Sequence, residues 1–116
     1  VAPKPEFSQN IRKHLKGMNK TETRYSMYLE AMKATGEILD WKFEGIKLRL
    51  ADRTWYHIDF VVTFPDRIEL HEVKGHWEND ARVKWKVAAD AFWMFKFVAV
   101  QWKRGQWVYE IYRGEK

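Results

Sequence analysis

The sequence predicts a mixed α/β fold of the α+β kind, built on a mixed β-sheet. Three observations support this class: the hydrophobic period is helical over residues 20–35, strand-like between residues 46 and 74, and helical again over residues 81–91. Two further apolar segments, 95–102 and 107–112, are typical of strands. The expected order is therefore helix, three strands, helix, strand, strand.

Composition excludes several classes of protein. The 116 residues are 46% hydrophobic and 16% aromatic, which is enough for a packed core and excludes a disordered chain. The absence of cysteine excludes disulfides, thiolate zinc sites and a cysteine nucleophile. No apolar segment approaches the ~20 residues of a membrane helix, and no signal sequence opens the chain. We therefore expect an intracellular, cytoplasmic protein without a membrane segment.

The charge of the chain is concentrated at its N-terminus. The formal net charge is +5, and Lys and Arg are in clear excess over acids in residues 1–20. We expect residues 1–18 to form a basic arm and residues 19–116 to form one domain. Such an arm can neutralise DNA phosphates, although a poorly ordered leader is the alternative. The candidate contacts are Lys13, Lys16 and Lys20.

The first helix has clear start and stop signals. Asn19 is the expected N-cap, Glu22 completes a capping box, and Gly36 ends the helix after residue 35. Glu22 also lies at one end of the apolar stripe rather than opposite it, a placement that calls for an explanation. The stripe itself follows helical spacing and comprises Tyr25, Tyr28, Leu29 and Met32.

An antiparallel hairpin is predicted around Pro65-Asp66. Residues 54–64 and 68–74 form β-rich segments on either side of this turn. With a two-residue turn, Asp59 lies opposite Glu72. Side chains alternate along a strand, so Lys74 shares the face of Glu72 and His71 points to the other face. Two acids and a lysine therefore meet on one face of the hairpin.

Two facing acids repel each other unless a positive charge lies between them. A hard divalent cation, Mg²⁺ or Mn²⁺, suits such a pair, and the carbonyl of Val73 is within reach as another oxygen ligand. Lys74 can hold or deprotonate a water on the cation, or stabilise the charge of a phosphate. Glu22 supplies a third carboxylate if the first helix packs across the sheet.

Other polar residues surround this predicted site. The second helix, over residues 81–91, is expected to be capped by Asn79 or Asp80, and its N-terminus favours a phosphate. Ordinary solvated side chains are the alternative for each cation on this helix. The candidate DNA contacts outside the arm are His57, His76, Arg82, Lys84 and Lys86.

These residues carry a resemblance to a known superfamily. Helix, three strands, helix, strand resembles the αβββαβ core of the restriction-endonuclease-like PD-(D/E)XK nucleases, here with an extra C-terminal strand. Asp59 with Glu72-Val73-Lys74 is similar to their motif, although Ile58 replaces the usual proline before the aspartate. Residues 19–22 and the basic second helix resemble small phage-encoded, Holliday-junction resolvase-like endonucleases. The similarity covers about residues 19–102.

The resemblance implies a function. It implies Mg²⁺- or Mn²⁺-dependent hydrolysis of phosphodiester bonds in branched DNA during recombination or repair, by a phage-encoded homodimer in the host cytoplasm. Asp59, Glu72 and the Val73 carbonyl would then be metal ligands. Glu22 would be an accessory ligand, and Lys74 would position water or stabilise charge.

Three alternatives remain open at this stage. A non-catalytic DNA-binding or architectural protein fits the same fold and basic arm, and a nuclease for flap or duplex DNA fits the same site. A carbohydrate-binding module fits the seven tryptophans but not the two helices. The last strand, with Trp107, Tyr109 and Ile111, is the candidate surface for self-association.

Overall fold

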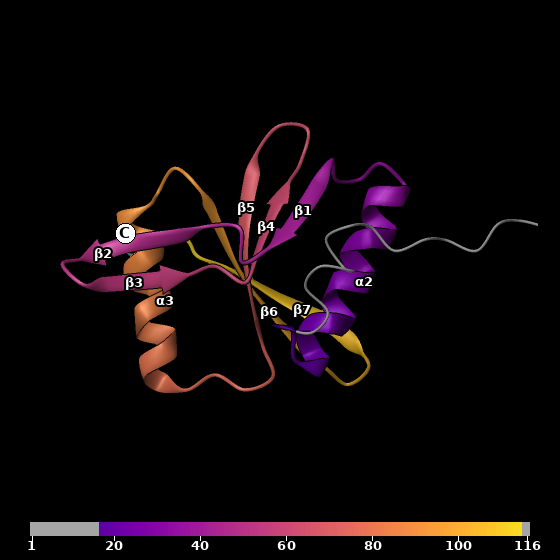
Figure 1. The fold of residues 1–116 in the computed structure, drawn as a ribbon. Helices are drawn as coiled ribbons and strands as arrows, with labels where there is room; N and C mark the ends of the chain where they lie inside the picture. Colours follow the sequence, from indigo (N-terminus) through magenta and orange to yellow (C-terminus); the bar gives the residue numbers. More distant parts are fainter. Residues whose placement is uncertain (1–16, 115–116) are drawn as a thin grey trace, which may run out of the picture.

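The computed structural model describes residues 17–114, in which a mixed five-stranded sheet lies between two layers (Figure 1). The sheet order is β1-β4-β5-β6-β7, with β5 and β6 parallel and the other neighbours antiparallel. The predicted α+β class with a mixed sheet is confirmed. The elements are α2 (Lys20–Ala34), β1 (Asp40–Phe43), β2 (Lys47–Ala51), β3 (Thr54–His57), β4 (Phe60–Thr63), β5 (Ile68–Lys74), α3 (Asn79–Ala91), β6 (Lys96–Lys103) and β7 (Gln106–Ile111).

The two faces of the sheet are covered by different layers. Helix α2 packs on one face, where Tyr25 and Leu29 join Phe60 and Val98 in a buried cluster. Helix α3 and the β2–β3 hairpin cover the other face, where Trp85 is central to a second cluster. Figure 1 shows α2 and α3 on opposite sides of the strands. Within residues 17–114, neither helix is long and apolar enough to cross a membrane.

The predicted strands before α3 are wrong in two respects. The segment 54–64 is not one strand, because it divides into β3 and β4, which belong to different sheets. A continuous strand would place Ile58 and Phe60 on one face, but Ile58 packs beside α3 and Phe60 packs beside α2. The segment predicted at 46–50 forms β2 in a separate two-stranded sheet, and the unpredicted strand β1 takes its place beside β4.

The hairpin register and the first helix cap are confirmed. Phe64 N–H donates to the Arg67 carbonyl at 2.8 Å across the two-residue turn, and Phe60 pairs with His71 in the predicted register. The capping box of α2 is complete, with Glu22 N–H donating to Asn19 at 2.8 Å. The predicted cap of the second helix is wrong: Asn79 and Asp80 lie inside its first turn, and Glu78 is the N-cap residue.

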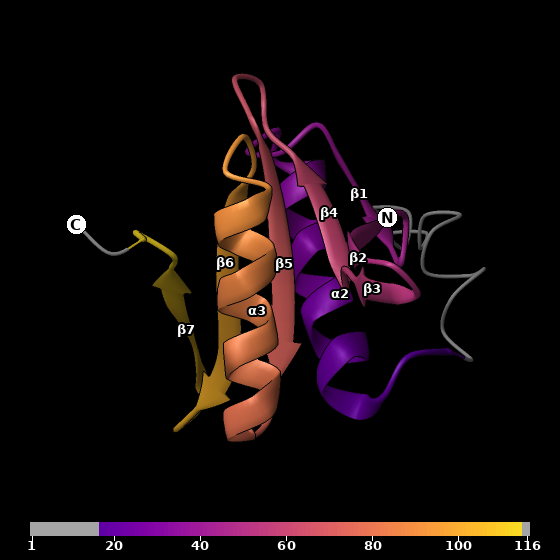
Figure 2. The same ribbon diagram turned by 90° about the vertical axis from the view of Figure 1, so that its left-hand side faces the viewer.

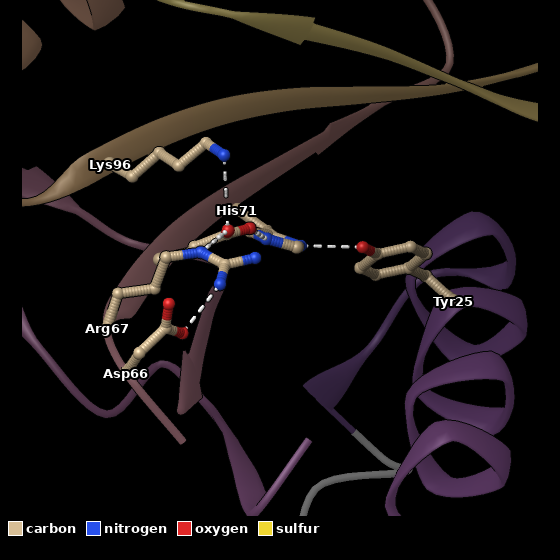
Figure 3. Close-up of polar contacts among 6 residues, drawn as sticks. Tyr25, Asp66, Arg67, His71 and Lys96 are labelled. Carbon is tan, nitrogen blue, oxygen red and sulfur yellow. Dashed lines mark hydrogen bonds and ion pairs between the residues drawn. The ribbon is translucent and has the colours of Figure 1, made fainter. Parts of the chain in front are cut away.

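A buried polar network ties α2 to the sheet (Figure 3). The Tyr25 hydroxyl donates to Nδ1 of His71 at 2.6 Å, and Nε2–H of His71 donates to Glu69 at 2.9 Å. The second Glu69 oxygen accepts from Arg67 at 2.6 Å and lies 3.5 Å from the Lys96 ammonium. His71 faces away from Glu72, as predicted. Each ring nitrogen and each Glu69 oxygen has a partner, so the network is structural.

Electrostatics in this network favour a neutral imidazole and an ionised carboxylate. Burial lowers the pKa of His71, which agrees with a neutral ring that donates through Nε2. Burial by itself would raise the pKa of Glu69, but the hydrogen bonds from His71 and Arg67 outweigh it and lower this pKa to about 2. The network therefore holds a buried negative charge that the folded chain stabilises.

Candidate functional site

The predicted acids gather at one end of the sheet. Asp59 directly precedes β4, Glu72 and Lys74 lie at the end of β5, and Glu22 lies in the first turn of α2. Figure 2 shows β5 ending, and α2 and α3 beginning, at the same end of the molecule. Residues 50 positions apart in the chain are thereby brought to one end of the fold.

Asp59 is fixed by the backbone of the neighbouring strand. Its Oδ2 accepts a hydrogen bond from the Val73 N–H at 2.9 Å, which leaves Oδ1 for another ligand. Burial and then the charge of Glu72 raise the pKa of Asp59 to about 8, and Glu22 adds to the same effect. The two acids therefore influence each other, as their predicted opposition requires.

Glu72 is a buried acid whose second oxygen has no partner. Its Oε1 lies 3.0 Å from the Lys74 ammonium, whereas Oε2 is buried and has no hydrogen-bond partner in the described part of the chain. Burial raises the pKa of Glu72, and Lys74 opposes that shift. Burial also lowers the pKa of Lys74, but Glu72 and the nearby acids outweigh it and raise this pKa. Lys74 is therefore a stable cation beside the acid.

Tyr56 is a site residue that the sequence reasoning missed. Its buried hydroxyl lies beside the Glu72 carboxylate but, among the described residues, makes no hydrogen bond of ordinary geometry. The pKa of Tyr56 is raised by burial, then by the charge of Glu72 and by the polar contact with that carboxylate. In a continuous strand over residues 54–64, Tyr56 would face away from Asp59. Because the strand ends at His57, Tyr56 lies beside Glu72 instead. Only a sequence pattern that predicted this strand end would have identified Tyr56 as a site residue.

The donor set fits a hard divalent cation in part. Two carboxylates offer oxygen ligands, and the unpartnered Oε2 of Glu72 is the kind of buried acceptor that a cation would satisfy. However, no three acidic or histidine side chains within residues 17–114 converge closely enough to hold an ion. Glu22 instead accepts the Asn19 N–H at 3.0 Å in the capping box. Glu22 and the Val73 carbonyl as ligands therefore stay predictions.

The predicted DNA contacts differ in their surroundings. Arg82 donates to Glu110 of β7 at 2.7 Å, so its charge is already balanced within the chain. The His76 ring lies 3.7 Å from the Glu78 carboxylate. Lys13 and Lys16 lie outside the described residues. The remaining candidates, all exposed, are Lys20, His57, Lys84 and Lys86.

Comparison with known proteins gives no relative for this chain. No family model, curated protein or solved structure is significantly similar to it. The resemblance to PD-(D/E)XK nucleases, carried by Asp59, Glu72 and Lys74, therefore stays a prediction. Within residues 17–114, the candidate site comprises half-buried Asp59 and Lys74 and buried Glu72, one oxygen of which makes no hydrogen bond of ordinary geometry.

Proposed function

We propose that this chain is a Mg²⁺- or Mn²⁺-dependent endodeoxyribonuclease that hydrolyses phosphodiester bonds in branched DNA. The observation that carries the proposal is the pair of half-buried Asp59 and buried Glu72: the charge of Glu72 raises the pKa of Asp59, and Oε2 of Glu72 has no hydrogen bond of ordinary geometry within residues 17–114. Keeping both acids ionised side by side is unfavourable, and the raised pKa of Asp59 reflects that cost. Such an arrangement is typical of a site that binds a cation and performs chemistry.

The residues of the site divide the work of hydrolysis. Asp59 and Glu72 would hold a divalent cation, and such a cation would supply Lewis-acid activation of water and of the phosphoryl group. Lys74, whose pKa is raised, remains protonated, so it serves to stabilise negative charge on the phosphate rather than to remove a proton. The water oxygen would bond to phosphorus and give up a proton to solvent, the bond from phosphorus to the 3′ oxygen would break, and that oxygen would take up a proton from solvent.

The arrangement of the elements supports the proposal. Helix α2, strands β1, β4 and β5, helix α3 and strand β6 follow the αβββαβ order of the PD-(D/E)XK superfamily. In this interpretation the β2–β3 hairpin is an insertion and β7 is the extra C-terminal strand. The choice of branched DNA and of a two-fold dimer rests on the resemblance, because symmetric cutting of a junction needs two sites related by an axis.

The test is cleavage of labelled four-way junction, Y-flap, single-stranded and duplex DNA with Mg²⁺ or Mn²⁺. We expect the wild type to cut the junction, and Asp59→Asn or Glu72→Gln to abolish cutting while DNA binding in metal-free buffer is kept or tightened. Glu69→Gln is the matched control, because this acid lies on the same strand but faces α2, so cutting should survive below its melting temperature.

Each outcome discriminates between the alternatives. Cleavage that survives in both Asp59→Asn and Glu72→Gln would remove these acids from the reaction and overturn the proposal. A wild type that binds every substrate but cuts none would identify a non-catalytic DNA-binding protein. Preferential cutting of the flap or the duplex would keep the nuclease chemistry and replace the junction as the substrate.

A further inference from the structure

The β2–β3 hairpin, residues 46–58, forms a two-stranded ribbon that is separate from the main sheet. Figure 1 shows the ribbon extending from the sheet across α3. Its inner face is apolar, because Leu48 and Tyr56 are buried in the cluster that contains Trp85. Lys47 pairs with His57, and Arg49 pairs with Trp55, so these four side chains share the opposite face. This outer face comprises Lys47, Arg49, Trp55 and His57, all exposed.

The ribbon carries a net positive charge of its own. Residues 47–53 contain three cations and one acid, a net charge of +2, while the charges of the other described residues balance. The one acid, Asp52, lies 3.7 Å from Arg49, but both side chains are exposed and the pair is weak. The outer face therefore presents uncompensated positive charge to solvent.

Trp55 adds an aromatic surface among these cations. Trp55 is 39% exposed, whereas Tyr56, which follows it in the strand and faces inward, is only 6% exposed. The Lys47 ammonium lies 4.6 Å from the centroid of the indole ring, which keeps the ring face and the charge together. Cations interleaved with an exposed aromatic ring are typical of nucleic-acid surfaces, where the ring contacts bases or sugars.

The base of the ribbon is fixed to the candidate site. Glu44 N–H donates to the Asp59 carbonyl at 2.8 Å, and Ile58 N–H donates to the Ile46 carbonyl at 3.1 Å. On the inner face, Tyr56 approaches Glu72. DNA bound on the outer face would therefore lie at a fixed distance from the carboxylates of Asp59 and Glu72.

We infer that the outer face of the ribbon binds a double-helical DNA arm, with Lys47, Arg49 and His57 on phosphates and Trp55 against the groove. The major groove of B-DNA admits a two-stranded β-ribbon, and cations on phosphates supply most of the affinity. The inference rests on the proposed function only for the claim that the bound DNA is also the substrate. It places the surface that binds the DNA on the ribbon, and not on residues 1–18 or on α3.

The test compares two double variants of the full-length chain that remove the same charge. Lys47→Gln with Arg49→Gln changes the ribbon, whereas Lys33→Gln with Arg113→Gln changes the end of α2 and the segment after β7. Binding of a fluorescent four-way junction and a duplex is measured in metal-free buffer over a range of salt. Circular dichroism and urea unfolding establish that both variants are folded.

We expect the ribbon variant to raise Kd at least tenfold and to reduce the slope of log K against log salt by about 2, because each phosphate contact contributes roughly 0.9. The control pair should change Kd less than threefold. Trp55→Ala should weaken binding without changing the slope. Equal losses in the two double variants, or an unchanged slope, would overturn the inference. A change in the mass of the particle, with DNA affinity unchanged, would instead identify the ribbon as a contact between copies.

This outcome is separable from the fate of the proposed function. Loss of cleavage in Asp59→Asn with an unaffected ribbon variant would keep the nuclease and overturn only the ribbon as its DNA surface. Ribbon-dependent binding by a wild type that never cuts DNA would keep the ribbon and overturn the nuclease.

Discussion

Two buried tyrosines on opposite sides of the sheet have opposite hydrogen-bonding states. The Tyr25 hydroxyl donates to Nδ1 of His71 at 2.6 Å, whereas the Tyr56 hydroxyl lies beside the Glu72 carboxylate and, among the described residues, makes no hydrogen bond of ordinary geometry. An unpaired buried hydroxyl costs stability, and a paired one contributes to it. The Tyr25 hydroxyl therefore contributes to the stability of the fold, whereas the Tyr56 hydroxyl can still form a hydrogen bond beside Glu72.

The same substitution should have different effects at these two positions. We expect Tyr25→Phe to lower the free energy of unfolding by about 1–2 kcal/mol, because Nδ1 of His71 loses its donor. Tyr56→Phe should change it by less than about 0.5 kcal/mol, or increase it, in metal-free buffer. Urea unfolding followed by fluorescence measures both. A larger loss for Tyr56→Phe than for Tyr25→Phe would show that Tyr56 is hydrogen-bonded in solution.

Glu69 makes the stability of the fold depend on pH. Its pKa is about 2 in the folded chain and 4.5 ordinarily, so the stability it contributes is complete above about pH 4.5 and is lost as the pH falls toward 2. Glu69→Gln cannot ionise at this position. The free energy of unfolding of the wild type should therefore exceed that of Glu69→Gln by about 1–3 kcal/mol less at pH 2.5 than at pH 5.5. Urea unfolding at the two pH values measures it. A constant difference would mean that Glu69 titrates normally.

At the scale of the element, the N-terminus of α2 combines a structural and a chemical role. Glu22 accepts the Asn19 N–H in the capping box, and its charge also raises the pKa values of Asp59 and Glu72. A glutamine at this position keeps the capping hydrogen bond and removes the charge. The cap and a metal-ligand role can therefore be tested separately.

Glu22→Gln should keep the stability of the chain and weaken its metal site. We expect the free energy of unfolding to change by less than about 0.5 kcal/mol, while Mn²⁺ affinity, measured by titration calorimetry, falls about tenfold. Asn19→Ala is the comparison, because it removes the cap acceptor and should cost about 1 kcal/mol. Unchanged Mn²⁺ affinity in Glu22→Gln would restrict Glu22 to the helix cap.

The elements also differ in how far the sequence predicted them. The β4–β5 register was predictable because Pro65-Asp66 sets a two-residue turn, and one turn determines every pair along a hairpin. The division of residues 54–64 was not predictable, because the segment is uniformly strand-forming and its break depends on which layer covers Ile58 and Phe60. Strand β1 was missed because four residues between a helix and a glycine give only a short alternating pattern.

At the scale of the molecule, the candidate site opposes stability until a cation binds. At neutral pH Asp59, whose pKa is about 8, retains a proton because full ionisation beside buried Glu72 is unfavourable. A divalent cation that displaces this proton and binds both acids should stabilise the folded chain. At a cation concentration ten times Kd the gain is about 1.4 kcal/mol, or roughly 3–8 °C in Tm.

The shift in Tm caused by Mn²⁺ should depend on Glu72 and not on Glu69, which lies on the same strand. We expect Mn²⁺ to raise the Tm of the wild type and of Glu69→Gln, which keep the site, but not that of Glu72→Gln, which lacks a ligand. Differential scanning fluorimetry with and without Mn²⁺ measures the shift, and Ca²⁺ serves as a second hard cation. An equal shift in Glu72→Gln would place the bound cation elsewhere on the chain.

The sequence by itself determined the fold class, the first helix with its capping box, and the β4–β5 hairpin with its register from Phe60–His71 to Thr63–Ile68. These features depend on local patterns: hydrophobic period, capping residues and a two-residue turn. Only the tertiary structure decided that Glu72 is buried with an unpartnered oxygen, that Tyr56 lies beside it, and that β2 and β3 leave the main sheet as a basic ribbon. Those properties depend on which layers meet across the sheet, and packing between distant segments is not contained in any local pattern.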